Sequence, residues 1–236
     1  MPSAPHSGRL ITRQKLTTRL THWIWAISLF FLLLSGLQIF NAYPRLHIGD
    51  EAGFTYDNAL LELAEFPGWL TIPSTQDLAT GRVVHFFFAW IFIGTVFVWF
   101  IASWRNRHLK KDVLPSVADV RGLPGDVRDH LRFKFHHTVR YSPLQKLAYG
   151  GVLFILFPLI ILTGLCMSPG MNAVLPWLPD LFGGRQTART IHFMVMVLLV
   201  LFFVVHMAMI VLAGPINELR SIVTGRYRID ARERKP

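Results

Sequence analysis

Residues 191–213 read IHFMVMVLLVLFFVVHMAMIVLA, and this stretch decides the fold class. It contains no Asp, Glu, Lys or Arg, and its length suits the roughly 20 residues that cross a bilayer as a helix. A helix packed on a soluble core would carry charged residues at helical period on its outer face. We therefore interpret the stretch as a membrane-spanning helix.

Three further stretches, at residues 23–40, 83–104 and 147–167, share this uncharged character. The whole chain of 236 residues is 52% hydrophobic and only 16% charged, which is typical of a membrane protein. Basic residues precede the first stretch as in a signal peptide, but the stretch is long for one and no cleavage site follows it. We predict an all-α integral membrane protein, a single membrane domain over residues 1–236. Its four-helix transmembrane bundle is expected at about 20–40, 83–104, 147–167 and 189–213.

The distribution of charge predicts the orientation. Segments 1–22, 105–146 and 214–236 carry 20 Lys and Arg against 7 Asp and Glu, whereas segments 41–82 and 168–190 carry 4 against 7. Because Lys and Arg near span ends stay in the cytoplasm, we expect both termini and the basic inner loop 105–146 to be cytoplasmic. This orientation accounts for the net charge of +10 without nucleic-acid binding.

The outer loop 41–82 is rich in Pro, Gly and acidic residues. Its short amphipathic stretch 59–66 could lie along the membrane interface. Two interpretations stay open at this point: a solvated loop, or a docking surface for another protein.

Four of the ten histidines lie inside or at the ends of the apolar stretches: His22, His85, His192 and His206. An ionisable group at membrane depth indicates function, although a lone histidine can simply hydrogen-bond between helices. His192 and His206 are 14 residues apart, so they share one face of a helix at depths about 21 Å apart. Because successive spans alternate in direction, His85 and His192 form an outer pair, and His22 and His206 form an inner pair.

Paired imidazoles favour haem over other cofactors. The one cysteine, Cys166, excludes an intrachain disulfide, a cysteine zinc site and a cysteine-ligated iron–sulfur cluster. A catalytic zinc would need a third protein ligand, and a proton relay in a membrane normally includes a carboxylate. We therefore interpret each pair as the two axial ligands of a haem.

Small residues could make room for such a macrocycle. Gly36 and Gly164 are the best candidates, since the first lies in Leu34-Ser-Gly-Leu and the second in the similar Leu162-Thr-Gly-Leu. Ordinary packing of membrane helices is the alternative for these glycines. The wider set of candidate glycines comprises Gly36, Gly94, Gly150, Gly151 and Gly164.

These features together resemble one family. The resemblance rests on six features: Arg19-Leu-Thr-His-Trp-Ile-Trp, Leu34-Ser-Gly-Leu-Gln-Ile-Phe, His85, Tyr141-Ser-Pro-Leu-Gln-Lys, His192 and His206. They are similar to the dihaem cytochrome b subunits of formate dehydrogenases, nickel–iron hydrogenases and thiosulfate-reductase-type enzymes, the cytochrome b561 group. The similarity extends from about Arg13 to Arg226, whereas the long outer loop departs from the shortest members.

The resemblance implies a function. In that family the four matching histidines hold two b-type haems, a quinone binds near the inner haem, and the protein sits in the bacterial inner membrane. The implied role is an electron-transfer subunit, carrying electrons between the quinone pool and a periplasmic oxidoreductase docked on the outer loops. The long outer loop looks like versions that accompany a molybdopterin enzyme. Whether the chain is itself an enzyme stays open.

Further residues are candidates around these cofactors. Each has a plain structural alternative, such as snorkelling at a helix end or anchoring at the interface. The candidates are Arg19, Arg82 and Arg189 for haem propionates, Tyr141, Gln145 and Lys146 for the quinone, and Thr21 and Thr190 as hydrogen-bond neighbours of the histidines.

Two other functions compete with the subunit. One is a stand-alone enzyme of the same fold that takes electrons from superoxide or another small donor and reduces quinone. The other is a haem-free transporter, which would be expected to carry acidic ligands inside the membrane. The four apolar stretches contain none.

Overall fold

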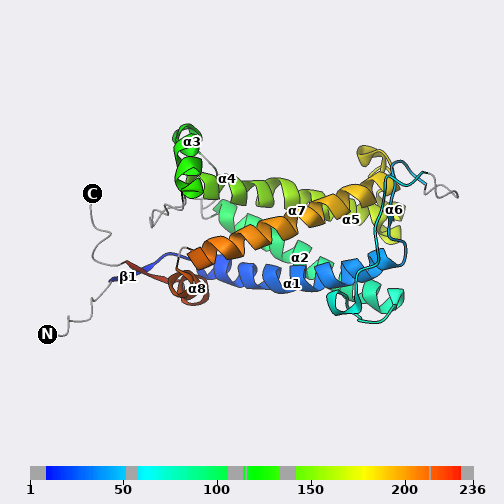
Figure 1. Cartoon of the computed structure of the whole chain (residues 1–236), viewed down its shortest axis with the longest axis horizontal. Helices are drawn as coiled ribbons and strands as arrows, with labels where there is room; N and C mark the ends of the chain where they lie inside the picture. Colours follow the sequence, from blue (N-terminus) through cyan, green and yellow to red (C-terminus); the bar gives the residue numbers. More distant parts are fainter. Residues whose placement is uncertain are drawn as a thin grey trace. The chain divides into compact units, whose positions relative to one another are not determined.

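The structure is a computed structural model that describes residues 9–51, 58–105, 114, 116–132, 142–212 and 214–229. These residues are mostly helical (Figure 1). Among these residues, four helices are long and apolar enough to cross a membrane: Leu16–Asn41, Leu78–Arg105, Pro143–Met167 and Arg185–Leu212. The prediction of a mostly helical chain with four candidate membrane spans is thereby confirmed, while the transmembrane bundle and the cytoplasmic placement of the termini stay predictions.

The chain divides into two compact units. Unit 1 comprises residues 1–23, 98–150 and 202–236, and unit 2 comprises residues 24–97 and 151–201. The helices α1 (Leu16–Asn41), α2 (Leu78–Arg105) and α7 (Arg185–Leu212) each contribute to both units. The inner histidine pair therefore belongs to unit 1 and the outer pair to unit 2.

Aromatic rings fill the core of unit 2. Phe31 of α1 stacks on Phe88 of α2 with ring centres 4.3 Å apart. Phe157 is 4% exposed and receives Phe92 and Trp25 edge-on. Burial of large rings in offset and edge-to-face contacts stabilises the helix packing within this unit.

The third span is not one regular helix. α4 (Pro143–Gly151) is followed by a π-helical turn, η4 (Val152–Leu156), and then by α5 (Phe157–Met167). Pro158 lacks an amide hydrogen, and its ring would collide with the carbonyl four residues before it in an α-helix. The wider turn before Pro158 relieves this collision, so the irregularity has a local cause in the sequence.

In unit 2 the outer loop is tied to the helices by hydrogen bonds. It contains the two-stranded sheet β2 (Arg45–Leu46) and β3 (Leu61–Glu62) and the short helix η2 (Gly68–Leu70). The Asn41 side chain donates to the Phe66 carbonyl and accepts from the Phe66 amide, both at 2.8 Å. Gln38 donates to the Thr75 carbonyl at 2.8 Å. After α5, unit 2 continues with α6 (Pro169–Val174) and η5 (Asp180–Phe182).

In unit 1 the first and last described segments pair as strands. β1 (Arg9–Thr12) runs antiparallel to β4 (Arg226–Ile229), with Arg9 opposite Ile229 and Thr12 opposite Arg226. The helix α8 (Pro215–Thr224) lies against this sheet, and both Glu218 carboxylate oxygens accept from Arg13, at 3.1 and 3.2 Å.

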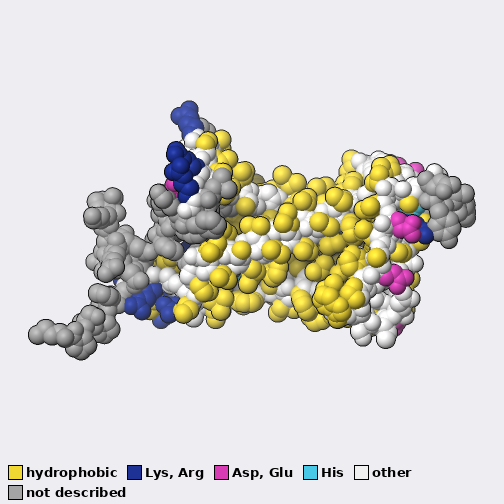
Figure 2. Space-filling model, in the orientation of Figure 1, with side chains coloured by type: hydrophobic (Ala, Val, Ile, Leu, Met, Phe, Trp, Pro, Cys, Tyr) yellow, Lys and Arg dark blue, Asp and Glu magenta, His cyan; other side chains and the backbone are white. Residues whose placement is uncertain are grey.

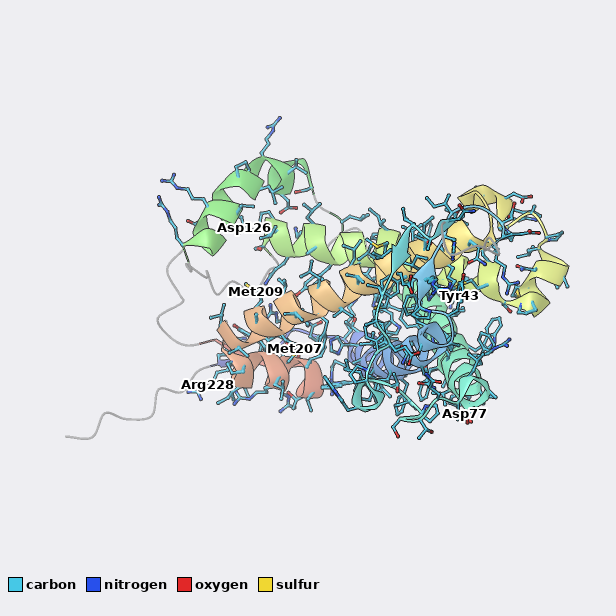
Figure 3. All side chains as sticks on the ribbon, turned by 45° about the vertical axis from the view of Figure 1, so that its right-hand side comes forward. Tyr43, Asp77, Asp126, Met207, Met209 and Arg228 are labelled. Atoms are coloured by element: carbon cyan, nitrogen blue, oxygen red, sulfur yellow. The ribbon has the colours of Figure 1, made fainter. Side chains whose placement is uncertain are left out.

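Another helix of unit 1, α3 (Val117–Leu131), is attached to the start of α4. Lys146 contacts Asp119 at 2.9 Å, and the Asp126 carboxylate accepts from the Leu144 amide at 2.8 Å. Figure 3 labels Asp126 on the side of α3 that faces α4. Each helix also begins with a capping box: Ser116 with Asp119, and Ser142 with Gln145.

Candidate functional site

The outer histidines face each other within unit 2. His85 is on the second turn of α2, and His192 is on the second turn of α7. Their ring centres are 6.4 Å apart and the ring planes are inclined by 59°. The structure thus brings together the two residues that the sequence paired at this depth.

This separation leaves room for both imidazoles to hold one metal ion. Two imidazoles that each bound the ion through a ring nitrogen, at about 2.0–2.1 Å, would have ring centres roughly 6 Å apart. The observed 6.4 Å agrees with that value. In the described part of the chain, no group of three or more His, Cys, Asp or Glu is arranged to hold a metal ion.

Each outer histidine has a hydroxyl partner on a neighbouring helix. The Ser35 Oγ of α1 lies 3.2 Å from the Nδ1 of His85, and the Thr163 Oγ1 of α5 lies 3.1 Å from the Nδ1 of His192. Both hydroxyl-bearing residues are 0% exposed. These contacts leave Nε2 as the ring nitrogen of each outer histidine that does not face a hydroxyl.

The two candidate glycines lie directly beside these imidazoles. A Cβ at Gly36 would be 3.3 Å from the His85 Cε1, and a Cβ at Gly164 would be 3.2 Å from the His192 Cε1. Both distances are tighter than ordinary van der Waals contact, so a side chain at either position would push on the ring. By contrast, a Cβ at Gly94, Gly150 or Gly151 would meet no atom within 4 Å.

The inner histidines have different surroundings within unit 1. The His22 Nδ1 is buried and has no hydrogen-bond partner among the described residues. The His206 ring stacks on Phe202 with centres 5.6 Å apart, and Tyr149 meets it edge-on at 6.1 Å. The pairing of His22 with His206 stays a prediction.

The two threonines expected beside the histidines make other hydrogen bonds. Thr21 donates to the Thr17 carbonyl at 2.9 Å, and Thr190 donates to the His47 carbonyl at 2.7 Å. Ser35 and Thr163 take the expected place at the outer pair. A signal for them was present in the sequence, since each precedes one of the repeated glycines.

The three candidate arginines differ in the contacts that their guanidinium groups make. Arg189 donates to the carbonyls of Arg45 and Tyr43 and so holds the outer loop. Arg19 donates to the Val223 carbonyl at the end of α8. Arg82 is exposed, with its guanidinium 5.8 Å from the centre of the Phe86 ring. A role for these side chains toward propionates stays a prediction.

Two of the three quinone candidates make other contacts in the structure. Tyr141 lies outside the described residues. The Gln145 Oε1 accepts from the Ser142 amide at 3.1 Å in a capping box, and the Lys146 ammonium binds Asp119 at 2.9 Å. These contacts agree with the anchoring alternative for the two residues, and their role toward a quinone stays a prediction.

Comparison with known proteins identifies the family to which the chain is similar. Residues 13–225 match the family model described as prokaryotic cytochrome b561. The chain is also 30% identical over 203 residues to a protein of Azospira oryzae with the provisional name protein-methionine-sulfoxide reductase subunit YedZ1. That alignment covers 82% of this chain and 87% of the relative.

Proposed function

The chain belongs to the prokaryotic cytochrome b561 family, whose members bind b-type haem, and on that premise we propose that it is a dihaem cytochrome. It carries electrons across the membrane between a quinone and a periplasmic oxidoreductase, which we propose to be a molybdopterin enzyme. The observation that supports this most directly is the 6.4 Å separation of the outer imidazoles.

His85 and His192 would hold one haem, and His22 and His206 would hold the other. A bound haem supplies a one-electron iron couple. Gly36 and Gly164 leave room beside the outer rings. The helix α7 contributes one histidine to each pair, which suits a cytochrome with one site toward each side of the membrane.

Charge supports the proposed orientation. In Figure 2 dark blue Lys and Arg side chains gather on α3 and near α8 of unit 1, while magenta Asp and Glu side chains gather on the outer-loop part of unit 2. By the positive-inside tendency, the segments that carry the Lys and Arg side chains would face the cytoplasm and the outer loop the periplasm. The quinone would then exchange electrons near the inner pair, with Gln145 and Lys146 at the start of the third span as candidates to bind it.

The name of the relative favours a subunit over a stand-alone enzyme. That protein is named as a reductase subunit. A reductase consumes electrons, so we propose that electrons leave the quinol pool through this chain toward a periplasmic partner. A quinone-reducing enzyme that accepts electrons from superoxide is the alternative, and it would need no partner subunit.

The outer loop is a suitable platform for such a partner. Its backbone is fixed to the helices of unit 2 by Asn41, Gln38, Arg189 and Thr190. It also presents Trp69, which is 79% exposed. Tryptophan is enriched at the energetic centres of protein interfaces, so we propose Trp69 as a contact for the partner.

Haem content tests the cytochrome assignment. Purified wild-type protein should give a b-type reduced-minus-oxidised absorption spectrum and two haems per chain. Intact protein that holds no haem would refute the assignment, and a ratio of one would refute the second site.

Co-purification from native membranes tests the partner. A periplasmic oxidoreductase should accompany the wild-type chain in stoichiometric amount, and Trp69→Ala should weaken its retention while leaving haem content unchanged. A monomer that reduces quinone with a soluble one-electron donor would instead favour the stand-alone enzyme.

A further inference from the structure

We propose that Ser35 and Thr163 are positioning residues for the outer pair. Each hydroxyl holds its histidine with the proton on Nδ1, so that Nε2 is left with the lone pair that binds iron. This inference rests on the proposed function, because it concerns the same two imidazoles.

The direction of the hydrogen bonds follows from counting protons. The Ser35 Oγ lies 2.6 Å from the Phe31 carbonyl oxygen, and the Thr163 Oγ1 lies 2.6 Å from the Leu159 carbonyl oxygen. A hydroxyl has one proton to donate, and a carbonyl can only accept it. Toward the imidazole each hydroxyl oxygen therefore acts as acceptor, and the ring nitrogen Nδ1 must donate.

Because the two hydroxyls are buried, water cannot readily replace them as hydrogen-bond acceptors. Ser35 and Thr163 are both 0% exposed, so bulk water has no access to these hydroxyls. An imidazole N–H that loses its partner in such a place is left unsatisfied, which is costly in a surrounding of low dielectric constant. The hydroxyls thus favour one tautomer and one ring orientation over the others.

The same arrangement of two carbonyls, a hydroxyl and a glycine occurs on two helices with the same spacing. On α1 the carbonyls that contact the hydroxyl are at 31 and 32, the hydroxyl is at 35 and the close glycine at 36. On α5 the corresponding positions are 159, 160, 163 and 164. Two spans that are distant in the sequence therefore position two histidines alike.

The hydroxyls should also tune the bound iron. A hydrogen-bond acceptor on the outer nitrogen of a ligating histidine fixes its orientation and raises its basicity as a ligand. A more basic ligand stabilises ferric over ferrous iron, so both hydroxyls would lower the midpoint potential of the outer haem. The His22 Nδ1 has no such partner among the described residues.

The test compares Ser35→Ala and Thr163→Val with the wild type, using haem affinity and potentiometric titration of the two haem components. In each variant the affinity for one haem should fall by about 10- to 100-fold, and the midpoint potential of that component should rise. The other component should keep its potential. Thr163→Ser and Ser35→Thr, which retain a hydroxyl, should restore both properties.

Two matched controls remove a hydroxyl from unit 2 without touching a histidine. Ser28→Ala alters a serine of α1 that is 1% exposed and has no hydrogen-bond partner among the described residues. Thr95→Val removes a hydroxyl that donates to the Ile91 carbonyl at 2.8 Å, in the manner of Thr163. Neither change should alter a potential or the haem content.

The outcomes separate this inference from the proposed function. Wild-type protein without haem would refute the function itself. Two haems whose affinities and potentials are unaffected by Ser35→Ala and Thr163→Val would refute only the positioning role. If Thr163→Val and Ser35→Ala lose haem but Thr163→Ser and Ser35→Thr lose it equally, the presence of the hydroxyl does not decide haem binding, and the inference is again wrong.

Discussion

The two histidine pairs of this chain consist of the same residue type but differ in the contacts that hold their rings. In the outer pair both Nδ1 atoms contact hydroxyls, at 3.2 and 3.1 Å, and glycines lie against both rings. In the inner pair the His22 Nδ1 is buried without a partner among the described residues, and His206 is held by aromatic rings. The outer site is therefore preorganised by directional bonds, whereas shape and stacking hold the inner one.

The units around the pairs differ in a similar way. In unit 2 the contacts that fix the outer loop use neutral side chains or an arginine that donates to carbonyls. In unit 1 the half-buried contacts between elements include the ion pairs of Arg13 with Glu218 and of Lys146 with Asp119. Unit 1 should accordingly respond more to the loss of a charge or to acid.

Removing one histidine from each pair gives the largest expected effect. His192→Ala and His206→Ala should each lose one of two haems, measured as the haem-to-protein ratio, because an iron with a single axial imidazole is held less tightly. The remaining haem should have a different spectrum and potential in the two variants. His47→Ala is a control, since among the described residues that buried ring hydrogen-bonds to Tyr43 and Asn58 and lies apart from both histidine pairs. Two haems retained in His192→Ala would contradict the assignment of the outer pair.

Crowding the outer rings should have an intermediate effect. In Gly164→Ala the new Cβ would lie 3.2 Å from the His192 Cε1, and in Gly36→Ala it would lie 3.3 Å from the His85 Cε1. Overpacking of this kind costs about 1–3 kcal/mol, so haem affinity at the outer site should fall by roughly 5- to 150-fold. Gly94→Ala, which meets no atom within 4 Å, should bind haem as the wild type does. Equal affinity in all three variants would show that these glycines do not limit the site.

Removing a charge from unit 1 should reduce stability without changing the outer haem. Glu218→Gln breaks the ion pair with Arg13, whose side chain is only 10% exposed, and should cost about 1–2 kcal/mol in the free energy of unfolding. Hydrogen exchange of the β1 and β4 amides would report the loss. The matched change Glu62→Gln affects a carboxylate that is 58% exposed, so it should cost less than about 1 kcal/mol. An equal effect of both changes would contradict this difference.

Acid should give the smallest effect, confined to α3. The Ser116 hydrogen bond, together with Lys146, holds the pKa of the Asp119 carboxyl well below its usual range. A lowered pKa means that the carboxylate stabilises the folded state above the unfolded pKa of about 3.9, and that this contribution fades as the pH falls below that value. The protection factor of the α3 amides, which compares the observed exchange rate with the intrinsic rate at the same pH, should therefore fall between about pH 5 and about pH 3, roughly one unit either side of that pKa. Asp119→Asn should show lower protection at pH 7 and a smaller loss of protection on acidification.

The four candidate spans could be predicted from the sequence because long uncharged stretches leave few alternatives to a membrane helix. The observed helices begin at Leu16, Leu78, Pro143 and Arg185, ahead of the apolar stretches. Their first turns are polar and hydrogen-bonded, as in the capping box of Ser142 with Gln145. Hydropathy detects the part of a helix that lipid can surround, so it does not register these turns.

The candidate site was predicted less completely than the spans. Helical spacing and span direction placed His85 with His192, because both properties follow from the sequence. The contacts of Ser35 and Thr163 depend on how neighbouring helices are rotated, and no periodicity within one helix reports that. The pairing of β1 with β4 joins residues more than 200 positions apart, so local sequence carried no signal for it.

That pairing has a consequence for biosynthesis. β1 leaves the ribosome first, but its partner β4 is translated only after every span has been made. The sheet therefore cannot form during insertion and closes only on a complete chain. A polypeptide truncated before Arg226 would leave β1 with an open edge, and such an edge is a feature that quality-control proteases and chaperones can recognise.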